Sequence, residues 1–398
     1  MSRLSQLFLD HVGQTSPSPI GIEVERAEGV YLYSPTGKRY IDLVSGVSVS
    51  NVGHNNPKVV EAVCSQAKKY LHLMVYGEVI QSPQVLYAQK LSELLPQGMD
   101  SVYFVNSGSE AVEAALKLAK RYTGRSRLVS FKNAYHGSTH GALSVMGDEY
   151  FRNSFRPLLP DTYSLEYNNF ENLSFIDESV AAVIIEPIQG EAGFIIPKKG
   201  FLDALRKKTT DVGALLIFDE IQCGFGRTGK LFASEYFGVT PDIIVMAKAF
   251  GGGMPLGGVA SPKSIMDVFQ SNPVLGHITT FGGHPVCCAA GLAALNYIID
   301  NNLVEAVAAK SALFLKLLGD NKNIVDIRSG GLLIAVEFGD NKLCGDVCRA
   351  SVEAGILTES FLFCESAMRI APPLTISLSE IREVCETLNR VINEVCGK

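Results

Sequence analysis

The sequence of 398 residues lacks features that would mark several classes of protein. It has no tryptophan. It also has no apolar run of about 18 residues, so the sequence predicts no membrane-spanning helix. The N-terminal residues MSRLSQLFLDHVGQ contain neither the apolar stretch nor the small-residue cleavage site of a secretory signal. We therefore expect a cytoplasmic protein that makes no membrane contact.

Basic residues are not in excess, because 35 Lys and Arg stand against 41 Asp and Glu. A net charge of −6 predicts no nucleic-acid partner. The nine cysteines are an odd number without a CxxC pair, which favours free, buried thiols in a reducing compartment. The seven histidines include no HExxH motif, and we expect no metal site.

Apolar runs and helical patterns predict an α/β fold. Three unalternating runs are typical of buried strands in a parallel sheet, and they cover residues 181–185, 214–218 and 243–246. The other predicted elements are a hairpin over 30–43, a mostly helical stretch over 58–95, strands over 102–105 and 332–336, helices over 111–121 and 202–210, and a C-terminal helix that starts near Ser377 with a capping box. The chain is also long enough for two domains.

A chemically useful residue follows each of the three apolar runs. Glu186 comes after the first, Asp219 after the second, and Lys248 after the third. Charged residues often end strands simply to reach water. Ligands of open α/β sheets, however, bind at the carboxyl ends of the strands, where these three residues would meet. The combination indicates a functional site.

A fourth element, Asn106 to Glu110, lies between a predicted strand and a predicted helix. Its glycine and hydroxyl residues suit phosphate binding at a helix N-terminus, although Ser107 and Glu110 also match an ordinary capping box. A lysine, an acid, a phosphate cradle and the flat ring of Tyr135 are the parts that hold pyridoxal phosphate. We therefore expect this cofactor.

The sequence resembles the class III (subgroup II) aminotransferases of pyridoxal-phosphate fold type I, close to the acetylornithine, ornithine and 4-aminobutyrate group. The resemblance rests on eight motifs in family order: NSGSEA at 106–111, YHG at 135–137, EPIQGE at 186–191, FDEIQ at 218–222, GFGRTGK at 224–230, MAKAFGGGMPLG at 246–257, TTFGGHP at 279–285 and MRIAPPLTIS at 368–377.

The resemblance implies a large cofactor-binding domain over 51–290 with a mainly parallel sheet. It also implies a smaller α+β domain over 291–398, joined by the N-terminal segment 1–50. It further implies a homodimer whose active sites are shared across the interface. The expected reaction moves an amino group from an amino acid or ω-amine to 2-oxoglutarate or pyruvate in two half-reactions with ping-pong kinetics.

Residue roles follow from the matching motifs. Lys248 would bond to the cofactor aldehyde and move the proton, and Asp219 would pair with the pyridinium nitrogen. The remaining cofactor-binding residues would be Ser107, Gly108, Ser109, Tyr135, Glu186, Ile221, Gln222 and, from the neighbouring subunit, Thr280. Arg369 would hold a substrate carboxylate, Glu191 would close Arg369 when no carboxylate is present, and Thr279 would also lie at the substrate site.

One position departs from the pattern. Many members carry an arginine for a distal carboxylate directly after the His-Gly pair, where this chain has Ser138. Residues 13–29 also lack the tyrosine of ornithine-type members. An amine or ω-amino acid:pyruvate transaminase is therefore an alternative, and an aminomutase of the same fold is a less favoured one. The GxGxxG match at 224–229 is interpreted as a structural loop, because five residues separate it from the preceding strand.

Overall fold

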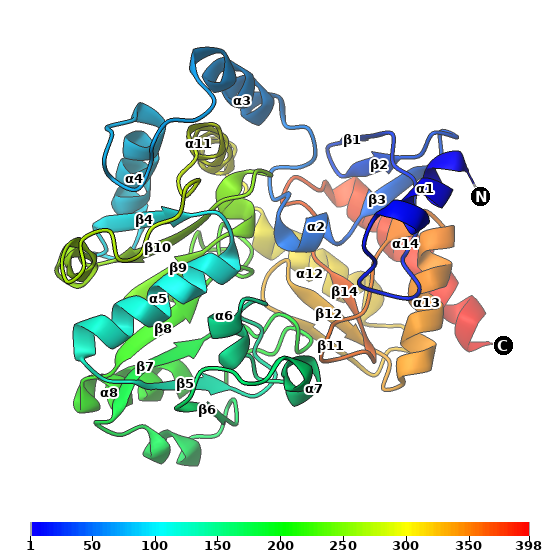
Figure 1. Cartoon of the computed structure of the whole chain (residues 1–398). Helices are drawn as coiled ribbons and strands as arrows, with labels where there is room; N and C mark the ends of the chain where they lie inside the picture. Colours follow the sequence, from blue (N-terminus) through cyan, green and yellow to red (C-terminus); the bar gives the residue numbers. More distant parts are fainter. Residues whose placement is uncertain (1, 398) are drawn as a thin grey trace.

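The computed structural model describes residues 2–397, which fold around three β-sheets (Figure 1). The largest sheet has the strand order β4-β10-β9-β8-β7-β5-β6. Its strands are β4 (Ser101–Val105), β5 (Arg127–Phe131), β6 (Thr162–Leu165), β7 (Val180–Ile185), β8 (Leu215–Asp219), β9 (Ile243–Met246) and β10 (Gly257–Ser261). Only β10 runs against the others, so the predicted mainly parallel sheet is confirmed.

The three predicted central strands, β7, β8 and β9, are buried along their whole length. Alternate residues face opposite layers, and both layers are apolar. Ile184 and Ile217 pack with α5 (Gly108–Thr123), whereas Leu216 packs with α8 (Phe201–Val212). Helices on both faces explain why these strands are continuous apolar runs. Figure 1 shows α5 lying across one face of the sheet.

A second group of helices packs against β4 and the start of the lysine segment. It consists of α3 (Pro57–Lys69), α4 (Ser82–Leu94) and α11 (Pro285–Asp300). The stretch predicted as mostly helical is thus two helices joined by irregular residues 70–81. Pro83 lies in the first turn of α4, where its missing N–H costs nothing.

Two smaller sheets lie beside the large one (Figure 1). One is β1 (Arg26–Glu28), β2 (Tyr31–Tyr33), β3 (Arg39–Asp42) and β13 (Ile356–Leu357); the other is β11 (Asp326–Ser329), β12 (Ile334–Glu337) and β14 (Ala367–Ile370). The predicted hairpin is β2–β3, and the strand predicted over 332–336 lies two residues later as β12. Because β3 pairs with β13, the N-terminal hairpin joins the C-terminal part of the chain. The domain boundaries at residues 50 and 290 stay a prediction.

The C-terminal helices α12 (Val307–Leu318), α13 (Asn341–Glu353) and α14 (Leu378–Cys396) pack together. The predicted capping box of α14 is present, since the Glu380 N–H donates to Ser377 Oγ at 3.2 Å and the Ser377 N–H donates to the Glu380 carboxylate at 2.7 Å. The shorter helices are α1 (Arg3–His11), α2 (Ser45–Ser48), α6 (His140–Ser144), α7 (Glu149–Arg152), α9 (Ala233–Phe237) and α10 (Lys263–Met266), with 3₁₀ turns η1 (Asn153–Phe155), η2 (Glu171–Phe175), η3 (Lys248–Gly251) and η4 (Asp267–Gln270). No helix within residues 2–397 is long and apolar enough to cross a bilayer.

Candidate active site

A cavity of about 510 Å³ lies at the carboxyl ends of β7, β8 and β9. Ten of its lining residues are the sequence-predicted Ser107, Gly108, Ser109, Tyr135, Glu186, Asp219, Ile221, Gln222, Lys248 and the adjoining His136. Residues far apart in the chain meet here because parallel strands end at the same edge of the sheet.

Lys248 begins η3 directly after β9, with a backbone φ of 53°. Burial lowers the pKa of its amine, and the positive charge of Arg369 lowers it further, while the carboxylate of Glu191 acts in the opposite direction. A lowered pKa increases the fraction of neutral amine, which is the form that attacks a carbonyl carbon. The position of Lys248 in the cavity therefore suits covalent bonding to an aldehyde.

Asp219, the last residue of β8, is almost fully buried. Its Oδ1 accepts the Ile221 N–H at 3.1 Å, and its Oδ2 lies 2.7 Å from Nδ1 of His136. The carboxylate is thus fixed by one backbone group and one ring, and it can accept a further hydrogen bond from a ligand. No local spacing in the sequence indicates this contact, because His136 and Asp219 are 83 residues apart.

Glu186 is buried directly after β7, and burial raises its pKa to about 7. Its two carboxylate oxygens accept the backbone N–H groups of Tyr135 and Gly190, each at 3.0 Å. Glu186 therefore ties the segment that carries Tyr135 to the segment that carries Gly190. These contacts indicate that Glu186 positions the cavity wall.

The N-terminus of α5 opens into the cavity through Ser107, Gly108 and Ser109. Ser107 is the N-cap, and its Oγ accepts the Glu110 N–H at 3.2 Å. The capping interpretation and the phosphate interpretation are compatible, because the first N–H groups of a helix still lack partners within it. Gly137 (φ 124°) packs so closely on Ser109 that a Cβ there would overlap the Ser109 hydroxyl.

Gln222 is a buried lining residue whose side-chain Nε2 has no hydrogen-bond partner among residues 2–397. A buried amide donor without a partner is costly unless a ligand or water accepts its hydrogen bond. The cavity thus contains an anion-binding helix end, an amine, a carboxylate and an unused amide donor.

Glu191 and Arg369 form a buried ion pair, with Arg369 Nη2 2.7 Å from Glu191 Oε2. Burial tends to raise the pKa of Glu191, but the charge and hydrogen bond of Arg369 outweigh it and lower that pKa. Arg369 lies on β14 of a smaller sheet and packs its guanidinium over the Phe361 ring at 4.6 Å. Neither member of the pair lines the 510 Å³ cavity, although both charges affect Lys248.

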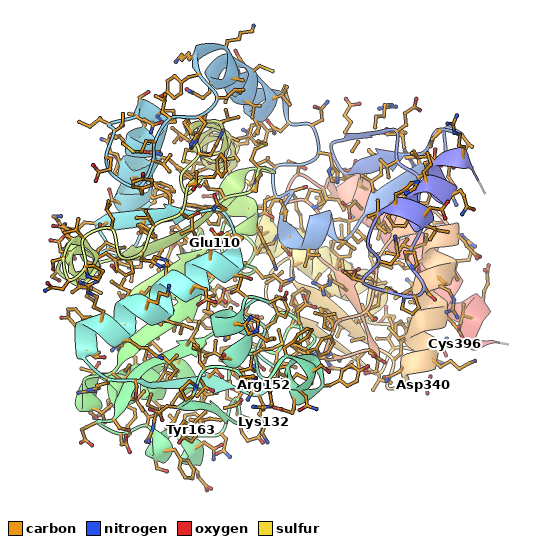
Figure 2. The ribbon with its side chains drawn as sticks, in the orientation of Figure 1. Glu110, Lys132, Arg152, Tyr163, Asp340 and Cys396 are labelled. Atoms are coloured by element: carbon orange, nitrogen blue, oxygen red, sulfur yellow. The ribbon has the colours of Figure 1, made fainter. Side chains whose placement is uncertain are left out.

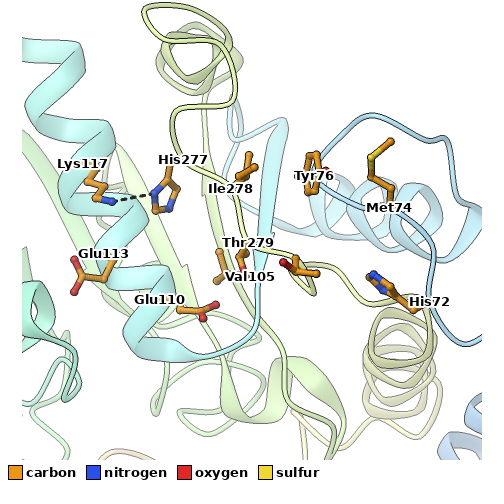
Figure 3. Close-up of a pocket in the computed structure, with 11 residues that line it drawn as sticks. His72, Met74, Tyr76, Val105, Glu110, Glu113, Lys117, His277, Ile278 and Thr279 are labelled. Carbon is orange, nitrogen blue, oxygen red and sulfur yellow. Dashed lines mark hydrogen bonds between the residues drawn. The ribbon is translucent and has the colours of Figure 1, made fainter.

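Thr279 and Thr280 line a second hollow of about 680 Å³, together with residues of α5 and of the 70–81 segment (Figure 3). Thr279 Oγ1 accepts the Asn106 side-chain N–H at 2.7 Å, so it lies beside the turn that leads into α5. Thr280 is not among the residues that line the cavity of its own chain.

The glycine-rich loop at 224–229 is structural, as predicted from its distance to β8. Arg227 in this loop is completely buried, and its Nη1 donates to the Pro372 carbonyl beside the Arg369 strand. Burial lowers the pKa of Arg227 to about 9. The Arg227 carbonyl also accepts the Leu332 N–H, so the loop is tied to the C-terminal part of the chain.

The α/β sheet with a lysine, an aspartate and a helix N-terminus at one edge has the parts of a pyridoxal-phosphate enzyme. Comparison with known proteins gives the family: residues 12–392 match the model of the class-III aminotransferases, and the chain belongs to this family. It is 41% identical over 369 residues to the acetylornithine aminotransferase of Archaeoglobus fulgidus, covering 92% of this chain and 94% of that protein. It is 39% identical over 383 residues to the putrescine aminotransferase of Pectobacterium atrosepticum, covering 92% of this chain and 81% of that protein.

Solved structures agree. The chain superimposes on a transaminase from the marine bacterium Virgibacillus with a TM-score of 0.93 at 29% identity, covering 99% of both chains. It superimposes on the ornithine aminotransferase of Toxoplasma gondii with a TM-score of 0.91 at 30% identity, covering 99% of this chain and 95% of that one. The protein is therefore a class III transaminase.

Class III aminotransferases use pyridoxal 5'-phosphate. The cavity fits this cofactor on its own evidence, because the end of α5 suits a phosphate and the free Nε2 of Gln222 suits an acceptor oxygen of the ring. No group of three His, Cys, Asp or Glu side chains within the described part of the chain could hold a metal.

Proposed function

We propose that this chain transfers an amino group from an amine or amino acid to a 2-oxo acid, with Lys248 as the catalytic residue. The observation that carries the proposal is that Lys248 and Asp219 follow adjacent strands and line one cavity with the N-terminus of α5. When bound there, pyridoxal 5'-phosphate supplies an electron-withdrawing ring that stabilises negative charge on the substrate carbon.

The residues around the cavity would divide the work of holding the cofactor. Ser107, Gly108 and Ser109 would bind its phosphate, and Tyr135 would cover one face of the ring. Asp219, held by His136, would keep the ring nitrogen protonated. Ile221, Gln222 and Glu186 would complete the cofactor pocket, with Gln222 donating to an oxygen of the ring.

Lys248 would have two roles in turn. Its amine would hold the cofactor through the aldehyde, and when free it would move a proton to and from the substrate carbon. The lowered pKa of Lys248 supports both roles, because each requires an unprotonated amine.

Arg369 would bind a substrate carboxylate through two parallel hydrogen bonds. When the substrate offers no carboxylate, Glu191 would pair with Arg369, as it does in this structure at 2.7 Å. A pair that can exchange partners lets one site accept an amine in one half-reaction and a 2-oxo acid in the other. This need for two alternating substrates supports transfer over an aminomutase reaction.

Candidate donors are acetylornithine, putrescine and ornithine, for which relatives and a similar solved structure are named, and the 4-aminobutyrate-like compounds that the motif resemblance implies. Ser138 favours the second candidate, an amine or ω-amino acid:pyruvate transaminase. A serine cannot form a two-point ion pair with the distal carboxylate of 2-oxoglutarate. Pyruvate has no distal carboxylate and would not need such a partner.

We also propose that the active form is a homodimer, with Thr280 serving the neighbouring subunit and Thr279 lying at the substrate site. The hollow around Thr280 is lined by the exposed apolar side chains Met74 and Ile278, and the 70–81 segment at its edge also carries the exposed Ile80. Exposed apolar groups on this scale suit a protein interface. Sedimentation tests this arrangement: we expect the wild type to have the mass of two subunits and Ile80→Asp the mass of one. A wild type with the mass of one subunit would exclude the arrangement.

A cytoplasmic location stays a prediction. All nine cysteines are free thiols, which supports a reducing compartment.

A half-reaction screen tests the proposed function. The holoenzyme is mixed with single amino donors in the absence of any 2-oxo acid, and the absorbance of the lysine-linked cofactor is followed. We expect at least one donor to convert the cofactor fully to its amine form, and Lys248→Ala to lack the lysine-linked band from the start. If no donor converts the cofactor, or if Lys248→Ala keeps the wild-type spectrum, the proposal fails.

A further inference from the structure

Arg369 faces two carboxylates, and the proposed mechanism uses only one of them. Its Nη2 lies 2.7 Å from Oε2 of Glu191, and its Nε lies 3.7 Å from Oε1 of Glu359. The Glu359 carbonyl also accepts the Arg369 backbone N–H at 2.8 Å, which holds the two residues side by side. The side chain of Arg369 is 2% exposed and that of Glu359 is 36% exposed, so Glu359 is the member of this pair that solvent reaches.

Carboxylates outnumber the guanidinium around Arg369. Burial raises the pKa of Glu359, and the charge of Arg369 lowers it. The neighbouring carboxylates of Glu191 and Asp42 act in the same direction as burial, so the pKa of Glu359 stays raised overall. Asp42 is in turn held by His54, whose Nε2 lies 2.8 Å from Asp42 Oδ2. A further carboxylate, from a substrate, would therefore enter a region where negative charge is already in excess.

Other groups near Glu359 do not offset its charge. A hydrogen bond with a neighbouring cysteine and burial raise the pKa of the Cys348 thiol on α13, so this thiol stays neutral. Helix α7 packs on Phe363, which belongs to the same segment as Glu359. Arg152 on α7 (Figure 2) is committed elsewhere, because its Nε donates to Glu149 at 2.9 Å and its Nη1 donates to two backbone carbonyls.

Arg369 has supports other than Glu359. Its guanidinium lies 4.6 Å from the ring centroid of Phe361 and 5.8 Å from that of Phe194, and its backbone is part of β14. Its Nη1 has no hydrogen-bond partner within the described part of the chain. If Glu191 moves away, Nη1 and Nη2 can bind a carboxylate at two points while Nε stays beside Glu359. The main effect of Glu359 on Arg369 is therefore one of charge.

We propose that Glu359 is a specificity-determining residue that acts through Arg369: its charge weakens the binding of a substrate carboxylate and favours donors that bring none. The inference rests on the proposed transamination, with Arg369 as the carboxylate-binding residue. A carboxylate that replaces Glu191 meets a guanidinium that Glu359 already partly neutralises, and the like charges repel. An amine without a carboxylate leaves the pair of Arg369 and Glu191 intact, so Glu359 does not oppose its binding. Because Glu359 is partly exposed, solvent limits the effect to about two- to fivefold in affinity.

Separate half-reactions measure this effect. The lysine-linked form of the holoenzyme is mixed with butylamine or hexylamine, and the amine form is mixed with pyruvate. In Glu359→Gln, which keeps the shape of the side chain, the half-saturating concentration of pyruvate should fall about two- to fivefold. The maximal rate with pyruvate and the rate constants for both amines should stay at their wild-type values. A half-saturating concentration that is unchanged or higher would overturn the inference, as would equal gains for pyruvate and the amines.

The pH dependence separates the charge of Glu359 from its shape. Lowering the pH protonates Glu359, and its raised pKa brings this step closer to neutral pH. The wild type should then behave as Glu359→Gln does, because both side chains are neutral. We expect the ratio of their half-saturating pyruvate concentrations to be largest at high pH and to approach one as the pH falls. Taking the ratio at each pH cancels the ionisation of groups that both proteins share, such as Lys248, Glu191 and Asp42. A ratio that does not change with pH would assign the effect to shape and contradict the inference.

Two further variants serve as controls. Glu359→Asp keeps the charge and should stay closer to the wild type than Glu359→Gln does. Glu365→Gln changes an exposed carboxylate on the same segment and should leave every constant unaltered. If amino acids react with the wild type and the two amines do not, the inference fails while the proposed function stands. If no donor of either kind converts the cofactor, the proposed function itself fails.

Discussion

The Nδ1 atom of His136 lies 2.7 Å from Oδ2 of Asp219, and both side chains are buried. Since a carboxylate only accepts hydrogen bonds, the ring must donate from Nδ1. The remaining ring nitrogen, Nε2, has no partner among residues 2–397. His136 thereby fixes the orientation of the carboxylate that is proposed to face the cofactor ring.

Replacing His136 by alanine should weaken cofactor binding. The loss of a hydrogen bond to a charged group costs about 1.5–3 kcal/mol, so we expect the Kd for pyridoxal 5'-phosphate to rise by about tenfold or more. Titration of the apoenzyme, followed by cofactor absorbance, measures this value. His140→Ala, an exposed change at the start of α6, is the matched control. An unchanged Kd in His136→Ala would show that Asp219 does not depend on this ring.

Arg369→Ala should destabilise the fold as well as weaken the binding of carboxylate substrates. Glu191 would remain buried without its cation, and breaking such a pair costs about 3–5 kcal/mol. Urea denaturation gives the free energy of unfolding directly. The exposed pair of Arg390 and Glu394 supplies a control, since Arg390→Ala should cost at most about 1 kcal/mol. Equal costs for the two variants would contradict the ion-pair argument.

The pH dependence of stability should reflect buried Glu220. Burial raises its pKa to about 7, although it accepts the N–H groups of Ala233 and Ser234 at 2.5 and 2.7 Å. The folded state therefore holds a proton that the unfolded state loses near its lower pKa. The contribution of Glu220 to the free energy of unfolding is fully present below the pKa that Glu220 has in the unfolded state. It declines by on the order of 3 kcal/mol as the pH rises to about 7.

Glu220→Gln should reduce the loss of stability with rising pH. The loss is measured as the change in the free energy of unfolding between pH values of about 5 and about 8. Glu186 shifts in the same direction and keeps part of the slope. The exposed Glu178→Gln should leave the slope as it is in the wild type. If Glu220→Gln retains the full slope, Glu220 ionises normally in the folded protein.

Ser138 should determine how the enzyme treats its acceptor. We expect the wild type to discriminate weakly between pyruvate and 2-oxoglutarate. Ser138→Arg should raise the relative kcat/KM for 2-oxoglutarate by about tenfold or more, because the new guanidinium can bind a distal carboxylate at two points. Ser174→Arg, an exposed change on η2, should leave the ratio unaltered. A strong wild-type preference for 2-oxoglutarate would mean that another residue supplies the cation.

The parts of the fold that could be predicted are those with a strong local pattern. β7, β8 and β9 are continuous apolar runs, and the residues that follow them could be placed at one sheet edge by topology alone. β10 could not be predicted, because its sequence GGVAS has no apolar run. Its small residues are required by packing, because a Cβ on Gly257 would overlap the carbonyl of Ser107, the N-cap of α5.

The candidate site shows the same division. Motif residues were placed in the cavity by strand order, whereas the contact of His136 with Asp219 and that of Phe363 with Tyr135 depend on loops that meet only after folding. Tyr135 and Phe363 are 228 positions apart in number (363 − 135), and no periodicity connects them. Such contacts follow from the sheet and its loops, not from any local pattern.

Glu191 is held at two points by one segment, through its carbonyl by the Phe363 N–H and through its carboxylate by the Leu362 N–H. When its carboxylate leaves Arg369, only the second bond has to break, and the backbone bond can persist. The proposed exchange would then be a side-chain rotation on an anchored main chain. We therefore expect the switch between half-reactions to need no movement of the backbone around Glu191.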